Sequence, residues 1–191
     1  SYGDERRTTI VERAAAQALD ETQLVSSEPV TVVLSQAGYA RAAKGHEIDP
    51  ATLSYRSGDG YLASAQGRSN QLAMFIDSTG RVYSVMAGTL PSARGQGEPL
   101  TGRFNPPAGQ IFVATLGGDP EQWWLLASDA GYGFVTTLGE LHTKNRSGKA
   151  VLSLPPGAKV LAPSAVNDDS RWVASVSNEG RLLLFPLEEL P

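Results

Sequence analysis

The chain has 191 residues, 41% of them hydrophobic, and a formal net charge of −4, so it is long enough to bury the core of one domain or of one array of repeats. It contains no cysteine, which excludes disulfide bonds, thiol catalysis and most structural zinc sites. No apolar run approaches the roughly 18–20 residues that are needed to span a bilayer, so we expect neither a membrane-spanning segment nor a signal peptide within these residues.

The first segment is predicted to contain a short amphipathic α-helix at about residues 8–22. Thr9 and Glu12 have the spacing of a capping box. Apolar residues then recur at every fourth position, at Ile10, Ala14 and Ala18. Pro29 cannot continue a helix and opens the first strand, so we take residues 1–28 as an N-terminal linker that carries this helix.

A short turn recurs four times in the remaining sequence. Each copy has Ser or Asp at its first position and Gly at its fourth: Ser35–Gly38, Asp77–Gly80, Ser128–Gly131 and Ser177–Gly180. This pattern is typical of a type I turn between two antiparallel strands. The turns are about 40 to 50 residues apart, which indicates a propeller-like array of small sheets.

Each turn joins two predicted strands. The four hairpins are Val30–Leu34 with Tyr39–Ala42, Leu72–Ile76 with Arg81–Val85, Trp123–Ala127 with Tyr132–Thr136, and Trp172–Val176 with Arg181–Phe185. After each of the first three hairpins, a polar loop and a Gly/Pro turn precede a third strand, expected at Tyr61–Ala65, Ile111–Leu116 and Lys159–Ala162. The expected fold is therefore all-β over residues 29–191, with about three complete repeats and a partial fourth.

The tryptophans are interpreted as core residues. Trp123–Ala127 is a continuous apolar run, typical of a strand that is buried on both faces. We therefore expect Trp123, Trp124 and Trp172 to pack between neighbouring sheets rather than to stack on a ligand.

Candidate catalytic and metal-binding groups are sparse. The two histidines, His46 and His142, are far apart in the sequence and have no cysteine beside them. The adjacent carboxylates of Asp168 and Asp169 are typical of a solvated turn, and Gly95-Gln96-Gly97 lacks the Lys and Ser/Thr of a phosphate-binding loop. We expect neither a cofactor nor catalysis by this chain.

Basic residues gather in the polar loops that follow the first three hairpins. The candidate DNA-binding residues are Arg41, Lys44, Arg94, Arg103, Lys144, Arg146 and Lys149. Neighbouring Gly, Ser and Asn residues would let backbone N–H groups approach phosphate oxygens as well. A single loop of this kind is more often a solvated turn, but equivalent positions in successive repeats would form an interrupted basic stripe along one edge of the array.

Four segments closely resemble the C-terminal domains of the A subunit of bacterial topoisomerase IV (ParC), a family related to the C-terminal domain of DNA gyrase A. The segments are Ser27–Gln36, Lys44–Asp49, Leu90–Gly102 and Ala127–Phe134. The resemblance extends from about Tyr2 to Pro191. It implies a β-pinwheel, which is a propeller-like ring or open arc whose sheets exchange strands.

The resemblance also implies a function and partners. Domains of this family bind and bend double-stranded DNA and influence which DNA topologies the enzyme acts on, while the catalytic tyrosine, metal-binding carboxylates and ATPase lie elsewhere in the holoenzyme. The implied partners are DNA, the remainder of ParC and the B subunit of topoisomerase IV, in the bacterial cytoplasm. The residues Ser92–Glu98 retain only one Arg and two Gly of the basic box of DNA gyrase A, and they end in a carboxylate. Bending is therefore expected rather than tight wrapping.

A second hypothesis remains open. Acidic side chains outnumber basic ones in residues 1–28 and 161–191, and the predicted helix has an apolar stripe. These features would also suit a protein-interaction propeller that docks on the topoisomerase core or on a chromosome-organising protein.

Overall fold

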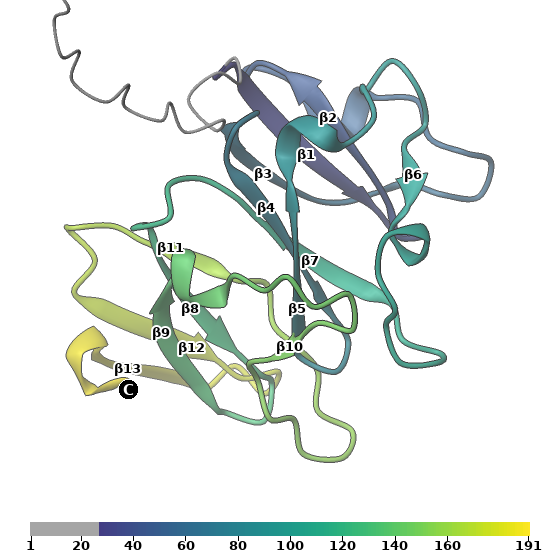
Figure 1. The fold of residues 1–191 in the computed structure, drawn as a ribbon. Coiled ribbons are helices and arrows are strands. Elements are labelled where there is room, and N and C mark those ends of the chain that lie inside the picture. The colour runs from purple at the N-terminus through teal and green to yellow at the C-terminus, as the bar shows by residue number, and fades with distance from the viewer. Residues whose placement is uncertain (1–26) are drawn as a thin grey trace, which may run out of the picture.

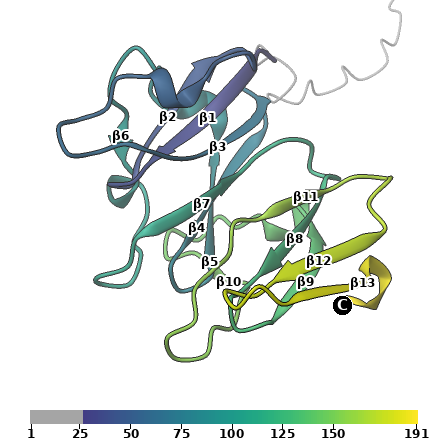
Figure 2. The ribbon, with the colours of Figure 1, turned by 180° about the vertical axis from the view of Figure 1, so that it is seen from behind.

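The computed structural model describes residues 27–191. The predicted helix at residues 8–22 lies outside the described residues. The described strands form four antiparallel sheets, shown from two opposite sides in Figures 1 and 2. All four predicted hairpins are confirmed, so this part of the chain is all-β, as the sequence predicts.

The first sheet has the strand order β3-β1-β2-β6. β1 (Pro29–Ser35) and β2 (Tyr39–Lys44) form the hairpin. β3 (Tyr61–Arg68) pairs with β1 from Pro29↔Arg68 to Ser35↔Tyr61, with a register shift at the end. The two-residue β6 (Glu98–Pro99) covers the other edge of the hairpin by pairing with the start of β2.

The second sheet repeats this arrangement, with the order β10-β5-β4-β7. β4 (Leu72–Asp77) and β5 (Arg81–Met86) form the hairpin, and β7 (Phe112–Leu116) pairs with β4. The two-residue β10 (Lys149–Ala150) pairs with the start of β5.

The third and fourth sheets contain fewer described strands. In the third sheet, β8 (Trp123–Ala127) lies between β11 (Ser164–Val166) and β9 (Gly133–Thr137). In the fourth, β12 (Trp172–Val176) pairs with β13 (Leu182–Pro186). Short 3₁₀-helices follow several strands, at Pro50–Thr52, Ala87–Thr89, Leu100–Gly102, Gly139–Leu141 and Leu187–Glu189.

The third strand of the third repeat is interrupted and extends a few residues beyond the segment that the sequence predicts. Within the expected segment 159–162, Val160 forms a bridge to Ser128, and Leu161 N donates to the carbonyl oxygen of Ala127 at 2.9 Å. Pro163 follows and has no N–H group with which to continue the ladder. The regular pairing with β8 therefore begins at Ser164.

Strand exchange links successive sheets. β6 belongs to the segment that follows the β4–β5 hairpin, yet it completes the first sheet. β10 follows the β8–β9 hairpin and completes the second sheet in the same way. Each of these two sheets therefore receives its outermost strand from the next repeat, so neighbouring repeats cannot separate without losing backbone pairing.

Two cores lie on opposite faces of the second sheet. Side chains alternate between the faces of a strand, and β4 accordingly places Phe75 in a cluster with the first sheet and Ile76 in a cluster with the third. The first cluster contains a group of aromatic rings from four segments, Phe75, Tyr83, Phe104 and Phe112. The second sheet is therefore the buried centre of the described structure.

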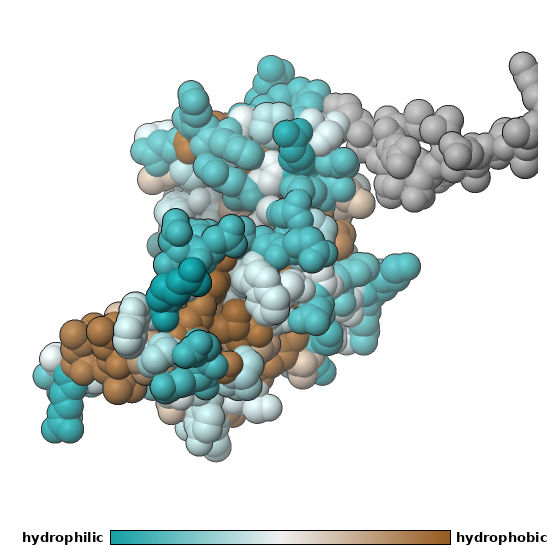
Figure 3. Space-filling view, turned by 90° about the vertical axis from the view of Figure 1, so that its left-hand side faces the viewer, coloured by the Kyte–Doolittle hydropathy of each residue, from teal (hydrophilic) through white to brown (hydrophobic). Residues whose placement is uncertain are grey.

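The expectation that all three tryptophans are core residues is wrong for two of them. Trp124 packs against the second core, but Trp123 and Trp172 are 49% and 61% exposed. Leu182, Leu183 and Leu184 in β13 are also exposed, because the two-stranded fourth sheet has little packed against it. Figure 3 shows apolar surface gathered low on the molecule, beneath a mostly polar upper part.

The turn of the second hairpin is organised by a buried carboxylate. Asp77 Oδ1 accepts hydrogen bonds from the backbone N–H groups of Thr79 and Arg81 and from the Thr79 hydroxyl, while Asp77 Oδ2 accepts one from the Tyr83 hydroxyl at 2.7 Å. Burial, together with this bond to a carboxylate, raises the pKa of Tyr83 well above its usual value. The segment that leads into the exchanged strand β10 packs against the ring of Tyr83.

Gly148 permits this close approach. Its φ is +73°, and a Cβ atom there would lie 2.7 Å from the Tyr83 ring. We expect Gly148→Ala to lower the free energy of unfolding by about 2–3 kcal/mol, since it combines backbone strain with a clash in a packed site. Gly157 has a similar φ of +84° and open space around it, so Gly157→Ala is the matched control, with an expected loss of about 1 kcal/mol. Urea unfolding measures both, and equal losses would contradict the role of Gly148 in strand exchange.

Candidate nucleic-acid interface

Two of the predicted basic loops run along equivalent edges of neighbouring sheets. We call residues 91–99 the first edge loop and residues 142–150 the second edge loop. The first runs alongside β2 in space: Ala42 N donates to Pro91 O at 2.9 Å, and Ala93 N donates to Ala42 O at 3.0 Å. This loop ends in β6. The second runs alongside β5 in the same way and ends in β10. Strand exchange therefore places both basic loops on outer edges.

Glycine holds the first edge loop against its sheet as well. Gly97 has a φ of +83°, and a Cβ atom there would lie 2.7 Å from the carbonyl oxygen of Ala40. Gly97 and Gly148 occupy the same place in the two loops, immediately before the exchanged strand. A buried leucine follows each exchanged strand: Leu100 directly after β6 and Leu152 two residues after β10.

Three predicted cations project from the edge loops into solvent. Within residues 27–191, the side chains of Arg94 and Lys144 are exposed and make no hydrogen bond or ion pair. Lys149 is exposed too, and its Nζ donates to the carbonyl oxygen of Glu140 at 2.7 Å. An ammonium group has three donors, so Lys149 keeps two for an anion. These three side chains can bind phosphate without breaking an internal contact.

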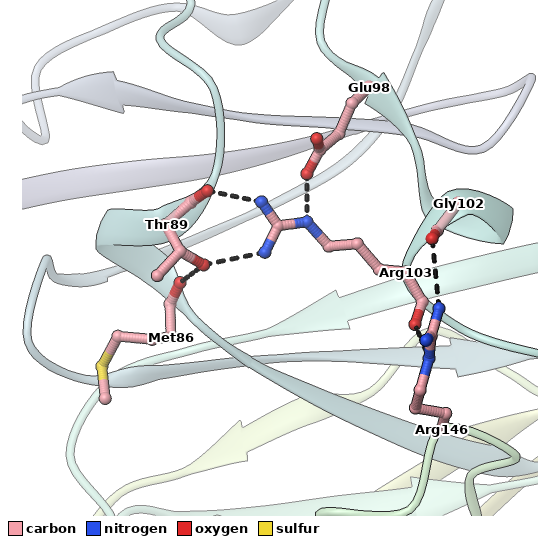
Figure 4. A network of polar contacts seen from close by, with 6 residues as sticks. All are labelled: Met86, Thr89, Glu98, Gly102, Arg103 and Arg146. Carbon is pink, nitrogen blue, oxygen red and sulfur yellow. Dashed lines mark hydrogen bonds and ion pairs between the residues drawn. The ribbon is translucent and has the colours of Figure 1, made fainter.

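Two other predicted cations hold the loops together instead (Figure 4). The guanidinium of Arg103 binds the carboxylate of Glu98 and both the hydroxyl and the carbonyl oxygen of Thr89. Arg146 reaches from the second edge loop to the carbonyl oxygens of Arg103, at 2.7 Å, and Gly102, at 3.3 Å. Arg103 and Arg146 therefore join the first edge loop, the segment after β6 and the second edge loop.

The structure places Arg41 away from any surface that a phosphate could reach, contrary to the expectation of an outer-edge contact. It lies on β2, where it is only 2% exposed. Lys44, at the opposite end of β2 from β6, is exposed and pairs with Glu28 at 3.0 Å. Such an exposed ion pair contributes little to stability and leaves the ammonium accessible.

The segment after the first hairpin differs from the other two basic loops. Residues 45–60, here called the covering loop, return across their own sheet to β3 and supply no exchanged strand. This loop carries Arg56, a cation that the sequence analysis does not single out. Arg56 is exposed, and its Cζ lies 4.2 Å from the ring centroid of Tyr39. The adjacent Tyr55-Arg56 pair was the available sequence signal.

Residues 27–191 hold no cluster of three or more His, Asp or Glu side chains that could bind a metal ion. In the same residues there is no helix with the length and apolar character needed to cross a membrane.

The different environments of Arg103 and Arg94 lead to different expected effects on stability. Arg103→Gln should lower the free energy of unfolding by about 1–2 kcal/mol, because it leaves Glu98 and Thr89 without their charged partner. Arg94→Gln, which removes the same charge from an exposed side chain, should change it by less than about 0.5 kcal/mol. Chemical denaturation compares them, and a comparable loss for Arg94→Gln would show that Arg94 is also structural.

Comparison with known proteins agrees with this architecture. A family described as "DNA gyrase C-terminal domain, beta-propeller" matches residues 122–167. The A subunit of DNA topoisomerase 4 from Pseudomonas aeruginosa is 58% identical over 192 residues, and that from Escherichia coli is 48% identical over 191 residues. Both alignments cover the whole of this chain, which spans about a quarter of the length of these curated relatives.

Solved structures extend the comparison. The chain resembles the E. coli ParC C-terminal domain with a TM-score of 0.80 and 50% identity, over 86% of this chain and 67% of that one. A DNA gyrase A C-terminal domain shares the fold at 14% identity, with a TM-score of 0.60 over 83% of this chain and 55% of that one. With identity, coverage and the strand-exchanged fold in agreement, the chain belongs to the family of topoisomerase IV ParC C-terminal domains, which have the β-pinwheel fold.

Proposed function

We propose that this chain is the DNA-binding and DNA-bending domain of a type II topoisomerase. The observation that carries this proposal is the placement of the exposed cations Arg94, Lys144 and Lys149 on equivalent edges of two successive sheets. Relatives whose names describe them as part of DNA topoisomerase 4 support DNA as the ligand.

The mechanism rests on phosphate contacts rather than on base recognition. Each edge loop has Gly and Ser beside its cations, and the second also has Asn145, so backbone N–H groups can join the side chains in binding phosphate. Because the two loops lie on separate sheets, a duplex that contacts both follows the curvature of the array. Bending a short site by tens of degrees costs on the order of 1–6 kcal/mol, so several weak contacts must act together.

The same loops favour modest bending over tight wrapping. Glu98 places a carboxylate at the end of the first edge loop, and Arg103 partly neutralises it. The net charge of the chain is −4, so attraction to DNA depends on the local edge rather than on the overall charge. Affinity should therefore be moderate and should fall steeply as salt concentration rises.

The domain would act within a larger enzyme of the bacterial cytoplasm. Its partners would be DNA, the remainder of the ParC chain, and the B subunit of topoisomerase IV. By holding one duplex on its outer edge, the domain would influence which DNA topologies are engaged in decatenation and supercoil relaxation. Catalysis would reside in the other parts of the holoenzyme.

Fluorescence anisotropy with a duplex of about 40 base pairs across a salt series tests the proposal. We expect log K to fall with log salt concentration with a slope of about −3 to −6, because each phosphate contact contributes roughly −0.9. The variant Arg94→Glu/Lys144→Glu/Lys149→Glu should bind much more weakly and with a flatter slope, since three phosphate contacts become repulsive.

Arg171→Glu is the control for charge reversal away from the edge loops. Arg171 is exposed and adjoins the acidic pair Asp168 and Asp169 at the start of the fourth sheet. It should leave the slope almost unchanged. An absence of binding by the unmodified chain at low salt, or equal losses in both variants, would refute the edge as the DNA site and favour the protein-docking hypothesis.

A further inference from the structure

Arg41 is a buried cation whose guanidinium contacts two surface loops. It is 2% exposed, and its neighbours across β1 include the fully apolar Val33. No carboxylate lies within ion-pair distance of it in the described part of the chain, and its Nη2 atom is buried without a hydrogen-bond partner. Burying a charge in this way is unfavourable, and an apolar side chain of similar size would fill the site at lower cost.

The first of these contacts is with the first edge loop. Arg41 Nη1 donates a 2.7 Å hydrogen bond to the carbonyl oxygen of Gly95. Backbone hydrogen bonds hold this loop to β2 on either side of residues 94–96, at Ala42 and at β6. Residues 94–96 themselves are not paired with β2. The hydrogen bond from Arg41 therefore fixes the middle of this unpaired stretch, directly beside the exposed Arg94.

The second contact is with the covering loop. The Cζ of Arg41 lies 4.6 Å from the ring centroid of Tyr55, which places the guanidinium over the face of the ring. The next residue, Arg56, stacks in turn on Tyr39 of β2. Two Arg–Tyr pairs thus connect the strand and the loop reciprocally, each side supplying one arginine and one tyrosine.

The far end of the covering loop is also fixed. Asp59 accepts hydrogen bonds from the N–H groups of Ala37 and Gly60. Although partial burial opposes it, the pKa of Asp59 is lowered by a hydrogen bond from Ser35, by these backbone bonds and by the charge of Arg41. The field of Arg41 therefore acts on the anchored end of the loop as well as on its middle.

A basic hollow lies between the two supported loops. Its volume is about 510 Å³, and its lining includes Ile48 and Leu53 of the covering loop, Ser92 and Arg94 of the first edge loop, and Lys44 of β2. Both walls of the hollow are tied to the same buried guanidinium. A small change at Arg41 would therefore move the first edge loop, which carries Arg94 into the lining, and the covering loop, which carries Arg56 outside it.

Resting on the DNA-binding function proposed above, we propose that Arg41 is a positioning residue that holds Arg94 and Arg56 in place to bind phosphates of the same duplex. Arg41 itself touches no DNA. Its fork donates to the edge loop and its flat face stacks on the covering loop, which a lysine could not do simultaneously. This adds Arg56 to the DNA-contacting set and gives Arg41 an indirect role in place of a direct one.

A mutant cycle on the 191-residue chain tests this, with the DNA-binding salt slope as the readout. Arg41→Met keeps the bulk of the side chain and removes the charge, the hydrogen bond and the stacking. We expect its salt slope to become shallower by about 1 to 2, the loss of one or two phosphate contacts, although the exposed arginines remain present. In the Arg94→Gln/Arg56→Gln background, adding Arg41→Met should change the slope no further.

Controls separate positioning from simple loss of stability. Val32→Ala removes buried volume from the other face of the same sheet, so it should lower the melting temperature and leave the slope unchanged. Arg41→Lys, which keeps the buried charge, provides a second measurement where the Met variant does not fold, and it should also give a shallower slope.

Two outcomes would overturn the inference. One is an unchanged slope in the Arg41 variants, and the other is an equal additional loss when Arg41 is replaced in the Arg94→Gln/Arg56→Gln background. Failure of the proposed function looks different, because the unmodified chain would then not bind the duplex, or would be insensitive to charge reversal at Lys144 and Lys149.

Discussion

β6 and β10 contribute only two residues each to their sheets, yet the position of every candidate DNA contact outside the first hairpin and its covering loop depends on their pairing. Each strand belongs to one repeat and pairs at the edge of the preceding sheet, so the basic loop before it lies along that edge as well. The pairing requires glycine at positions 97 and 148, where the backbone has a positive φ and lies against the neighbouring strand or ring. The same strand exchange that joins the repeats thus places the basic loops, with their cations, at the edges of the sheets.

The basic residues of the candidate interface divide into groups with different physical roles. Arg94, Lys144 and Lys149 are exposed and can bind an external anion. Arg103 and Arg146 donate hydrogen bonds to carbonyl oxygens and to Glu98, and these bonds fix the loops relative to one another. Arginine suits this second role because its planar fork reaches several acceptors at once, while lysine suits an exposed contact with a single phosphate. A count of cations therefore overstates the number available to an external anion.

Much of the fold could be predicted from the sequence because its signals are local. Turn residues at Ser35–Gly38 and its three counterparts specify hairpins through nearby backbone geometry, and all four are confirmed. Local signals fail where longer-range packing decides. Trp123 and Trp172 have the composition of core residues, but the sheets that carry them have too few described neighbours to cover them. The strand after Pro155-Pro156-Gly157 is divided, because Pro163 interrupts the ladder between the bridge at Val160 and β11.

By itself, the sequence determined that the chain is a repeating all-β array with cations in its loops. It could do so because turn formation depends on the types of a few adjacent residues, and these turns recur along the chain. Only the tertiary structure decided what those cations do. Arg41 and Arg94 carry the same side chain in neighbouring segments, but one is enclosed between two loops and the other projects into water. That difference arises from strand exchange and from the folding of the covering loop over β2, both of which join residues that are distant in sequence. Burial and hydrogen bonding, which set whether a charge can meet a phosphate, exist only after those contacts have formed.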